Sequence, residues 1–189
     1  MNTKYEFTGE TKIVCGCTLR RIKAIVAIGA TVAPGDIGGW IESENNLSMY
    51  VNAWVYDNAM VYDNAIVSGN AWVYGDARVF GNAWVSGNAR VYDNAMVSGD
   101  ACVYGDAWVS GDAEVSGDED YMTFKNSWSS GRWFTYTSSN KKWKVGCFYG
   151  TGAELVRKAY ADSALSGKCY EAIVRAVEAI EAAKKSEAK

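Results

Sequence analysis

The sequence predicts a mainly β protein, built as a parallel β-helix between two smaller parts. Three observations predict this fold: an uninterrupted six-residue repeat from Ala53 to Asp118, strand-prone segments before it, and a β-β-α-α pattern after it. The predicted boundaries are residues 1–46 for an N-terminal β cap, 47–118 for the β-helix and 119–189 for a C-terminal α+β domain.

The repeat has eleven copies, each of which starts with Ala-x-Val and ends with Gly or Asp followed by Asn or Asp. In such a short strand the pleat turns valine to one face and its neighbours to the other. Gly, Asp and Asn tolerate left-handed backbone, so each copy ends in a turn. Short strands joined by regular turns predict a coil with stacked valines inside it.

The first 46 residues are balanced, with five basic and five acidic side chains. Their apolar residues are typical of short strands. We expect this segment to cover the open end of the β-helix, which would otherwise expose unpaired backbone groups.

The Val-x-x-x-Ala-x pattern resembles the hexapeptide-repeat superfamily of left-handed β-helices. That resemblance implies 18 residues per coil, and therefore about four coils over residues 47–118. The run Gly35-Asp36-Ile37-Gly38-Gly39-Trp40-Ile41-Glu42 before the repeats resembles hexapeptide-repeat proteins of bacteriophages and prophages, whose function is uncharacterised. No activity follows from this resemblance.

An 18-residue coil has three outer faces, and one of them gathers aromatic rings around a single guanidinium. Rings in such a column usually mark a contact surface. We predict an oligomer interface here, and the resemblance to the hexapeptide-repeat superfamily implies a homotrimer. There are two alternatives. The chain's own C-terminal segment packs on this face, or the face binds a ligand, with Arg90 contacting an anionic group. The predicted interface residues are Trp54, Tyr56, Trp72, Tyr74, Arg90, Tyr92 and Trp108.

The C-terminal domain is predicted to contain two or three antiparallel strands within residues 121–149, followed by two helices. Thr151-x-x-Glu154 is typical of a helix start, Ser166-Gly167 is expected to separate the helices, and the tail is expected to fray from Lys184.

Basic side chains lie among the rings of the predicted hairpin, an arrangement that suits a nucleotide or another phosphate-rich ligand. The alternative is a solvated hairpin whose rings cover the two helices. The candidate ligand-binding residues are Arg132, Trp133, Tyr136, Lys141, Lys142, Trp143 and Lys144, together with Arg90.

The chain has no histidine, which removes Ser-His-Asp and Cys-His nucleophile systems and His-ligated zinc. The five cysteines are expected to be reduced thiols. The Cys15-x-Cys17 motif supplies at most half of a metal site. The aspartates of the repeat fit the conformation of the turns, and a ladder of calcium sites is the alternative. We predict no metal, no cofactor and no catalytic residue.

The net charge of −3 gives no strong case for DNA or RNA, and no apolar run is long enough to span a membrane. We expect a cytoplasmic, non-enzymatic, oligomeric binding protein of phage type. Its expected role is anti-defence, by sequestering a nucleotide immune signal or binding a host defence protein. The alternatives are an acyltransferase that lacks the usual histidine and a structural or assembly protein.

Overall fold

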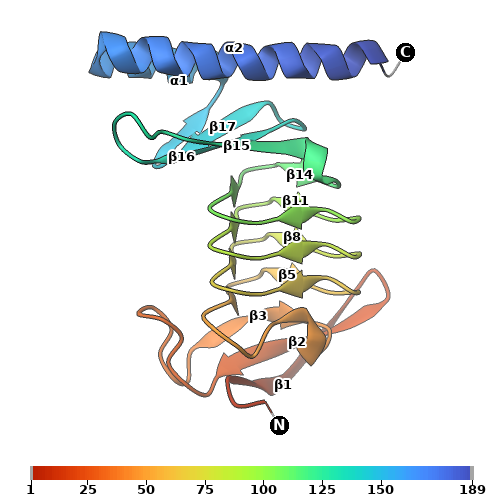
Figure 1. Ribbon diagram of the computed structural model, residues 1–189. Coiled ribbons are helices and arrows are strands. Elements are labelled where there is room, and N and C mark those ends of the chain that lie inside the picture. The colour runs from red at the N-terminus through yellow and green to blue at the C-terminus, as the bar shows by residue number, and fades with distance from the viewer. Residues whose placement is uncertain (1, 188–189) are drawn as a thin grey trace. The chain divides into compact units, whose positions relative to one another are not determined.

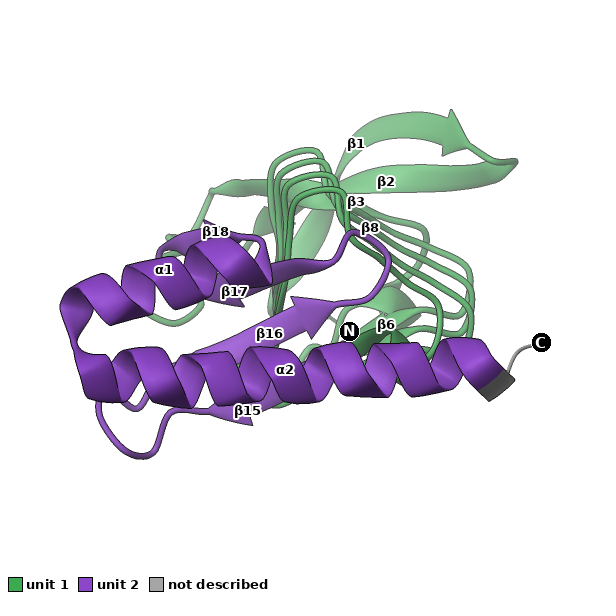
Figure 2. Cartoon of the chain, turned by 90° about the horizontal axis from the view of Figure 1, so that it is seen from above, with its two compact units in different colours: residues 1–121 green, residues 122–189 purple. Residues whose placement is uncertain are grey.

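The computed structural model describes residues 2–187 and divides the chain into two compact units, residues 1–121 and 122–189 (Figure 2). Unit 1 contains the β-solenoid and the strands before it, and unit 2 contains a small antiparallel sheet and two helices. The described residues contain no helix that is both long and apolar enough to cross a membrane.

Unit 1 begins with strands β1 (Tyr5–Val14), β2 (Cys17–Ala24) and β3 (Ile37–Ile41). The first two form an antiparallel hairpin, and β3 pairs antiparallel with β2. The other edge of β3 pairs in parallel with the solenoid, where Trp40 lies opposite Met60. The N-terminal strands therefore continue a solenoid sheet and provide partners for the backbone at its first coil (Figure 1).

The solenoid has three parallel sheets, each made of two-residue strands that stack as successive rungs (Figure 1). Paired residues are 18 positions apart, as Trp54 opposite Trp72 shows. One sheet contains β4 (Trp54–Val55), β7 (Trp72–Val73), β10 (Arg90–Val91) and β13 (Trp108–Val109). A second contains β5 (Met60–Val61), β8 (Arg78–Val79), β11 (Met96–Val97) and β14 (Glu114–Val115). The third contains β6 (Ile66–Val67), β9 (Trp84–Val85) and β12 (Cys102–Val103).

The alanines and valines of all eleven repeats are fully buried and form one continuous core. This confirms the predicted β-helix of about four coils. The corner that follows each of these strands except the last, β14, has left-handed backbone, which aspartate or glycine supplies, as at Asp57 (φ 53°) and Gly87 (φ 70°).

Two 3-10 turns flank the solenoid, Glu44–Asn46 before it and Asp118–Asp120 after it. Asn46 is buried and donates hydrogen bonds to the backbone oxygens of Asp63 and Ala65, 3.0 and 2.9 Å away. Lys4 is also buried, and its ammonium donates to the carbonyls of Ser48 and Ala53 at 2.9 and 2.6 Å. These side chains satisfy carbonyls that the irregular first coil leaves without a strand partner.

Unit 2 has a four-stranded antiparallel sheet, one strand more than the largest number predicted. Its strands are β15 (Tyr121–Lys125), β16 (Trp133–Thr137), β17 (Lys142–Val145) and β18 (Phe148–Gly150), paired in that order. The core joins rings of the sheet to apolar side chains of the helices, with Phe134, Trp143, Leu155, Val174 and Val177 all buried.

Helix α1 (Gly152–Asp162) begins at the predicted capping box, where Thr151 and Glu154 exchange hydrogen bonds. Helix α2 (Ala164–Glu187) corrects two expectations. The helices separate at Ser163, whose hydroxyl accepts from the Ser166 N–H, and Gly167 lies inside α2 against the ring of Tyr160. A β-carbon at Gly167 would lie 2.2 Å from that ring, so glycine permits close helix packing here and does not end a helix. The described helix also continues past Lys184.

Candidate functional site: an aromatic groove on the solenoid

The predicted aromatic face is formed by two rows of side chains on the sheet of β4, β7, β10 and β13. Strand pairing places one row in register, namely Trp54, Trp72, Arg90 and Trp108. The second row lies two residues further along each strand and contains Tyr56, Tyr74, Tyr92 and Ser110. The sequence therefore placed these side chains on one face correctly.

The exposure of this face differs from the expectation at two of its rings. Trp54 is fully buried, because Tyr5 of the cap packs edge-on against it at 6.2 Å between ring centroids. Tyr92 is also buried and stacks on Tyr74, with centroids 4.8 Å apart. Trp54 is therefore a core residue and not part of an exposed ladder, a correction that follows from the position of the cap.

Three of the remaining rings, those of Tyr56, Trp72 and Tyr74, line a groove of about 460 Å³. Tyr56 and Trp72 meet at 5.4 Å between centroids, with their planes tilted by 46°. The groove is lined by Thr31, Asp36, Tyr56, Asp57, Trp72, Tyr74 and Arg90. Thr31 and Asp36 come from the loop between β2 and β3, so the cap supplies one side of this hollow.

The charges around the groove act on its tyrosines. Partial burial, followed by the nearby carboxylates of Asp36 and Asp57, raises the pKa of Tyr56. Burial is also the main cause that raises the pKa of Tyr74 to about 12, against the opposing effect of Arg90. Both phenols stay protonated at neutral pH, so the groove presents neutral rings, two carboxylates and one guanidinium.

Arg90 lies between Trp72 and Trp108 in its row and is already in contact with an indole. Its guanidinium carbon is 4.7 Å from the centroid of the Trp108 ring, in cation–π geometry. Arg90 is therefore held by the aromatic row itself, while its side chain remains exposed.

The candidate ligand-binding residues of unit 2 do not form one site. Tyr136 and Trp143 are buried in the core, as in the alternative where the rings cover the helices. Lys141, Tyr136 and Trp143 border one hollow of about 290 Å³, which Glu178, Glu181 and Lys185 also line. Arg132 borders another of about 150 Å³, near Lys158 and Asp162.

The remaining candidates of unit 2 lie on its sheet. Trp133 is half-buried with the Lys125 ammonium 5.6 Å from its centroid, and Lys142 and Lys144 are half-buried on β17. Arg90 belongs to unit 1, whereas the other candidates belong to unit 2.

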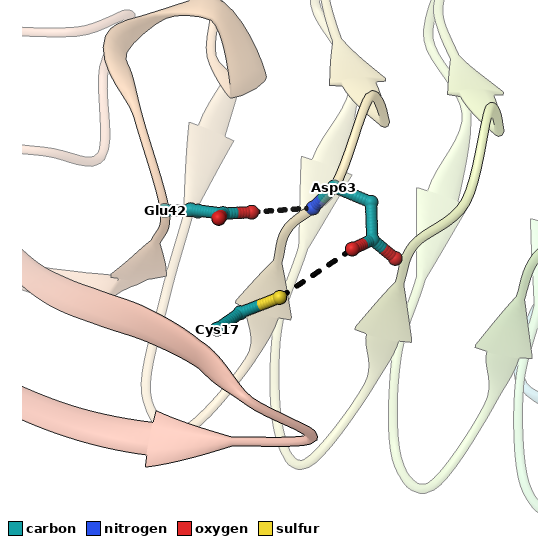
Figure 3. A group of neighbouring side chains, drawn as sticks. All are labelled: Cys17, Glu42 and Asp63. Carbon is teal, nitrogen blue, oxygen red and sulfur yellow. Dashed lines mark hydrogen bonds between the residues drawn. The ribbon is translucent and has the colours of Figure 1, made fainter.

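Cys17, Glu42 and Asp63 form a cluster of potential metal ligands, whose ligand atoms all lie within 4.8 Å of one another (Figure 3). Several of their polar atoms already take part in hydrogen bonds. The Cys17 thiol donates to Asp63 Oδ1 at 3.4 Å, and the Asp63 N–H donates to Glu42 Oε2 at 2.7 Å (Figure 3). Asp63 Oδ2 accepts from the Gly81 N–H at 3.1 Å.

Desolvation, the hydrogen bond to Asp63 and the neighbouring carboxylates raise the pKa of the Cys17 thiol, which disfavours the thiolate that a metal requires. Cys15, the other half of the motif, is exposed and does not join the cluster. The three residues therefore act as a hydrogen-bonded link between the cap and the first coil.

The most exposed tryptophan and tyrosine of the repeats lie on a different face from the one the sequence singled out. On the sheet of β6, β9 and β12, Trp84 is 51% and Tyr104 is 60% exposed. Trp84 Nε1 donates to Ser68 Oγ at 2.9 Å, which fixes the indole across the face. The repeat already assigns both residues to this third face. The sequence favoured the first face instead, because its row of aromatic residues is longer.

One comparison with known proteins supports the repeat architecture of the coils. The family model described as the YdcK beta-solenoid repeat matches residues 53–69, 61–75, 71–87 and 89–105, all within the solenoid. The curated proteins contain no match to the chain. Fold and repeat together define the class: this is a β-solenoid protein, mainly β, with a C-terminal unit of a small antiparallel sheet and two helices.

Proposed function

We propose that this protein is a non-enzymatic binding protein of phage type, which assembles into a homotrimer and binds a defence protein in the host cytoplasm. The observation that carries the binding role is the groove, where three aromatic residues, two carboxylates and one guanidinium border one concave surface. Rings with a few fixed polar groups are typical of binding sites.

The distribution of charge favours a protein partner over a nucleotide. Unit 1 has 7 basic and 16 acidic side chains, a formal charge of −9, whereas unit 2 has 12 basic and 6 acidic, a charge of +6. The net negative charge of unit 1 would repel a phosphate near the groove. The hollows of unit 2, at about 150 and 290 Å³, are small for a nucleotide.

The trimer is supported by the rings that remain accessible on the solenoid. Tyr74 and Trp108 are only half-buried in the single chain, and aromatic side chains are enriched at the centres of interfaces. The subunit contact then covers the Trp108 end of the face, and the hollow beside Trp72 stays open to a ligand at the boundary.

Native mass spectrometry of the full chain tests the assembly. We expect a species of three times the 20.6 kDa chain mass. Tyr74→Glu introduces a charge on the groove face and should release monomers. Tyr104→Glu, which introduces the same charge on the third face, should leave the trimer intact. A wild-type monomer at all concentrations would contradict the assembly.

A thermal-shift panel of cyclic and linear nucleotides tests the choice of ligand. We expect no change in Tm, because the acidic groove repels phosphate. A shift of several degrees with one nucleotide would overturn the preference for a protein partner, and would support the signal-sequestering role instead.

A further inference from the structure

The groove on unit 1 combines aromatic rings with negative charge, and both features attract cations. The faces of indole and phenol rings carry negative potential, which attracts cations. The two carboxylates that line the groove add full negative charges beside these rings. Against them stands one cation, Arg90, so the lining has a formal charge of −1.

The two carboxylates keep free capacity as acceptors. Asp36 Oδ2 accepts from the Ala33 N–H at 2.8 Å, and Asp57 Oδ2 accepts from the Gly75 N–H at 3.2 Å. A carboxylate offers about four lone pairs, so each retains acceptor sites. Among the described residues, no ion pair uses either of them.

Other rings of unit 1 show which partner this kind of surface takes. The Arg90 guanidinium lies 4.7 Å from the Trp108 centroid, and that of Arg20 lies 4.2 Å from the Phe7 centroid. Lys12 and Arg21 both lie over Trp40, at 4.4 and 5.1 Å. Trp72 occupies the same row as Trp108, one rung from Arg90, and faces the carboxylate-lined hollow.

We propose that the groove binds the guanidinium group of an arginine side chain from the partner protein, stacked on Trp72 and paired with Asp36 and Asp57. This inference rests on the proposed binding function and gives its ligand a chemical class. The volume of about 460 Å³ is large enough for one such side chain.

Guanidinium fits this groove better than ammonium for two reasons. It is planar and weakly hydrated, so it stacks on an indole while its edge donates to carboxylates. Its donors form a fork that can serve two acceptors at once. A lysine ammonium is a compact, strongly hydrated point charge and gains less from the ring.

The test is isothermal titration calorimetry of the full-length protein with three capped amino acids at low salt. These are N-acetyl-arginine methylamide, its neutral counterpart N-acetyl-citrulline methylamide, and N-acetyl-lysine methylamide. We expect the arginine compound to bind, the citrulline compound to bind at least about tenfold more weakly, and the lysine compound to lie between them. Equal affinity for arginine and citrulline would overturn the proposal, and equal affinity for lysine would overturn the choice of guanidinium.

Two double variants locate the binding to the groove. Asp36→Asn with Asp57→Asn removes both groove charges but keeps an oxygen to accept each backbone N–H, and Asn tolerates the left-handed backbone at position 57. Asp106→Asn with Asp112→Asn removes the same charge from other corners and still accepts from Asn88 and Asn94. We expect about a tenfold loss of arginine affinity in the first pair and none in the second. Equal losses in both would show a general charge effect and overturn the site.

The Trp72 indole signal reports whether the arginine compound binds at this ring, and the Trp72→Phe variant assigns that signal. In ¹⁵N-labelled protein the indole signal that this variant removes identifies Trp72, and we expect that signal to shift on titration with the arginine compound. An unshifted signal would overturn the proposal. If arginine fails to bind while native mass spectrometry still shows a trimer, the guanidinium site is wrong and the oligomeric assembly stands.

Discussion

The Asn52 side chain donates a hydrogen bond to Asn70 Oδ1, 3.1 Å away, and the two residues are 18 positions apart. The chain of donors continues from Asn70 to Asn88 and ends at Asp106. A second ladder runs from Asn64 through Asn82 to Asp100. Aspartate stands at the last acceptor position of each ladder, because a carboxylate accepts but cannot donate.

This order makes asparagine and aspartate unequal within a ladder. Asn82→Asp would replace the donor to Asp100 with a second carboxylate, so a hydrogen bond becomes a repulsion. We expect a loss of about 1 kcal/mol in the free energy of unfolding. Asp100→Asn keeps an acceptor for Asn82 and should change stability by less than about 0.5 kcal/mol. Urea unfolding measures both, and equal effects would contradict the ladder.

Crowding at the corners gives a second prediction. Gly87 and Gly105 have nearly the same left-handed backbone, with φ of 70° and 68°. A β-carbon at Gly87 would lie 2.8 Å from the Gly105 backbone nitrogen, whereas one at Gly105 meets nothing within 4 Å. We expect Gly105→Ala to cost about 1 kcal/mol from backbone strain alone, and Gly87→Ala to cost clearly more. Similar costs in denaturant unfolding would show that coil spacing adjusts freely.

The tryptophans of the repeat should differ in their contribution to stability. Trp54 is fully buried against Tyr5, so Trp54→Ala should lower the free energy of unfolding by about 3–5 kcal/mol. Trp84 is 51% exposed and has one side-chain hydrogen bond, to Ser68, so Trp84→Ala should cost about 1 kcal/mol or less. Thermal unfolding followed by circular dichroism compares them. A mild Trp54→Ala would mean that the cap does not cover the first coil.

Alkaline pH should destabilise both units through buried tyrosines. Burial raises the pKa of Tyr5 in unit 1 and of Tyr136 in unit 2 to about 12, from an ordinary value of 10. Between these values the folded state holds a proton that the unfolded state releases. The stabilising effect is therefore complete below pH 10 and is lost as the pH rises to 12.

Phenylalanine variants isolate this effect. Tyr5→Phe should lose on the order of 1 kcal/mol less than the wild type between pH 8 and 11, because it has no phenol to ionise. Tyr136→Phe should do the same for unit 2. Urea unfolding at pH 8, 10 and 11 measures the difference. If the variants follow the wild type across this range, other groups control the alkaline response.

Local patterns predicted the coils and the start of the first C-terminal helix. The alternation around Val73 and the turn residues after it depend on neighbours in sequence, as does the hydrogen-bond exchange between Thr151 and Glu154. The break assigned to Gly167 was wrong, since a small residue there serves close packing against Tyr160. Sequence alone does not distinguish a glycine that ends a helix from one that admits a neighbouring ring.

By itself the sequence determined the repeat, its inward valines and the rows in which outward side chains align, because each depends on a period within one short segment. Only the tertiary structure decided which of these side chains remain accessible. Tyr5, 49 residues earlier in the chain, buries Trp54, and the loop that carries Asp36 brings a second carboxylate to Asp57 and Trp72. Burial and local charge depend on groups that arrive from distant parts of the chain, and a local period carries no information about them.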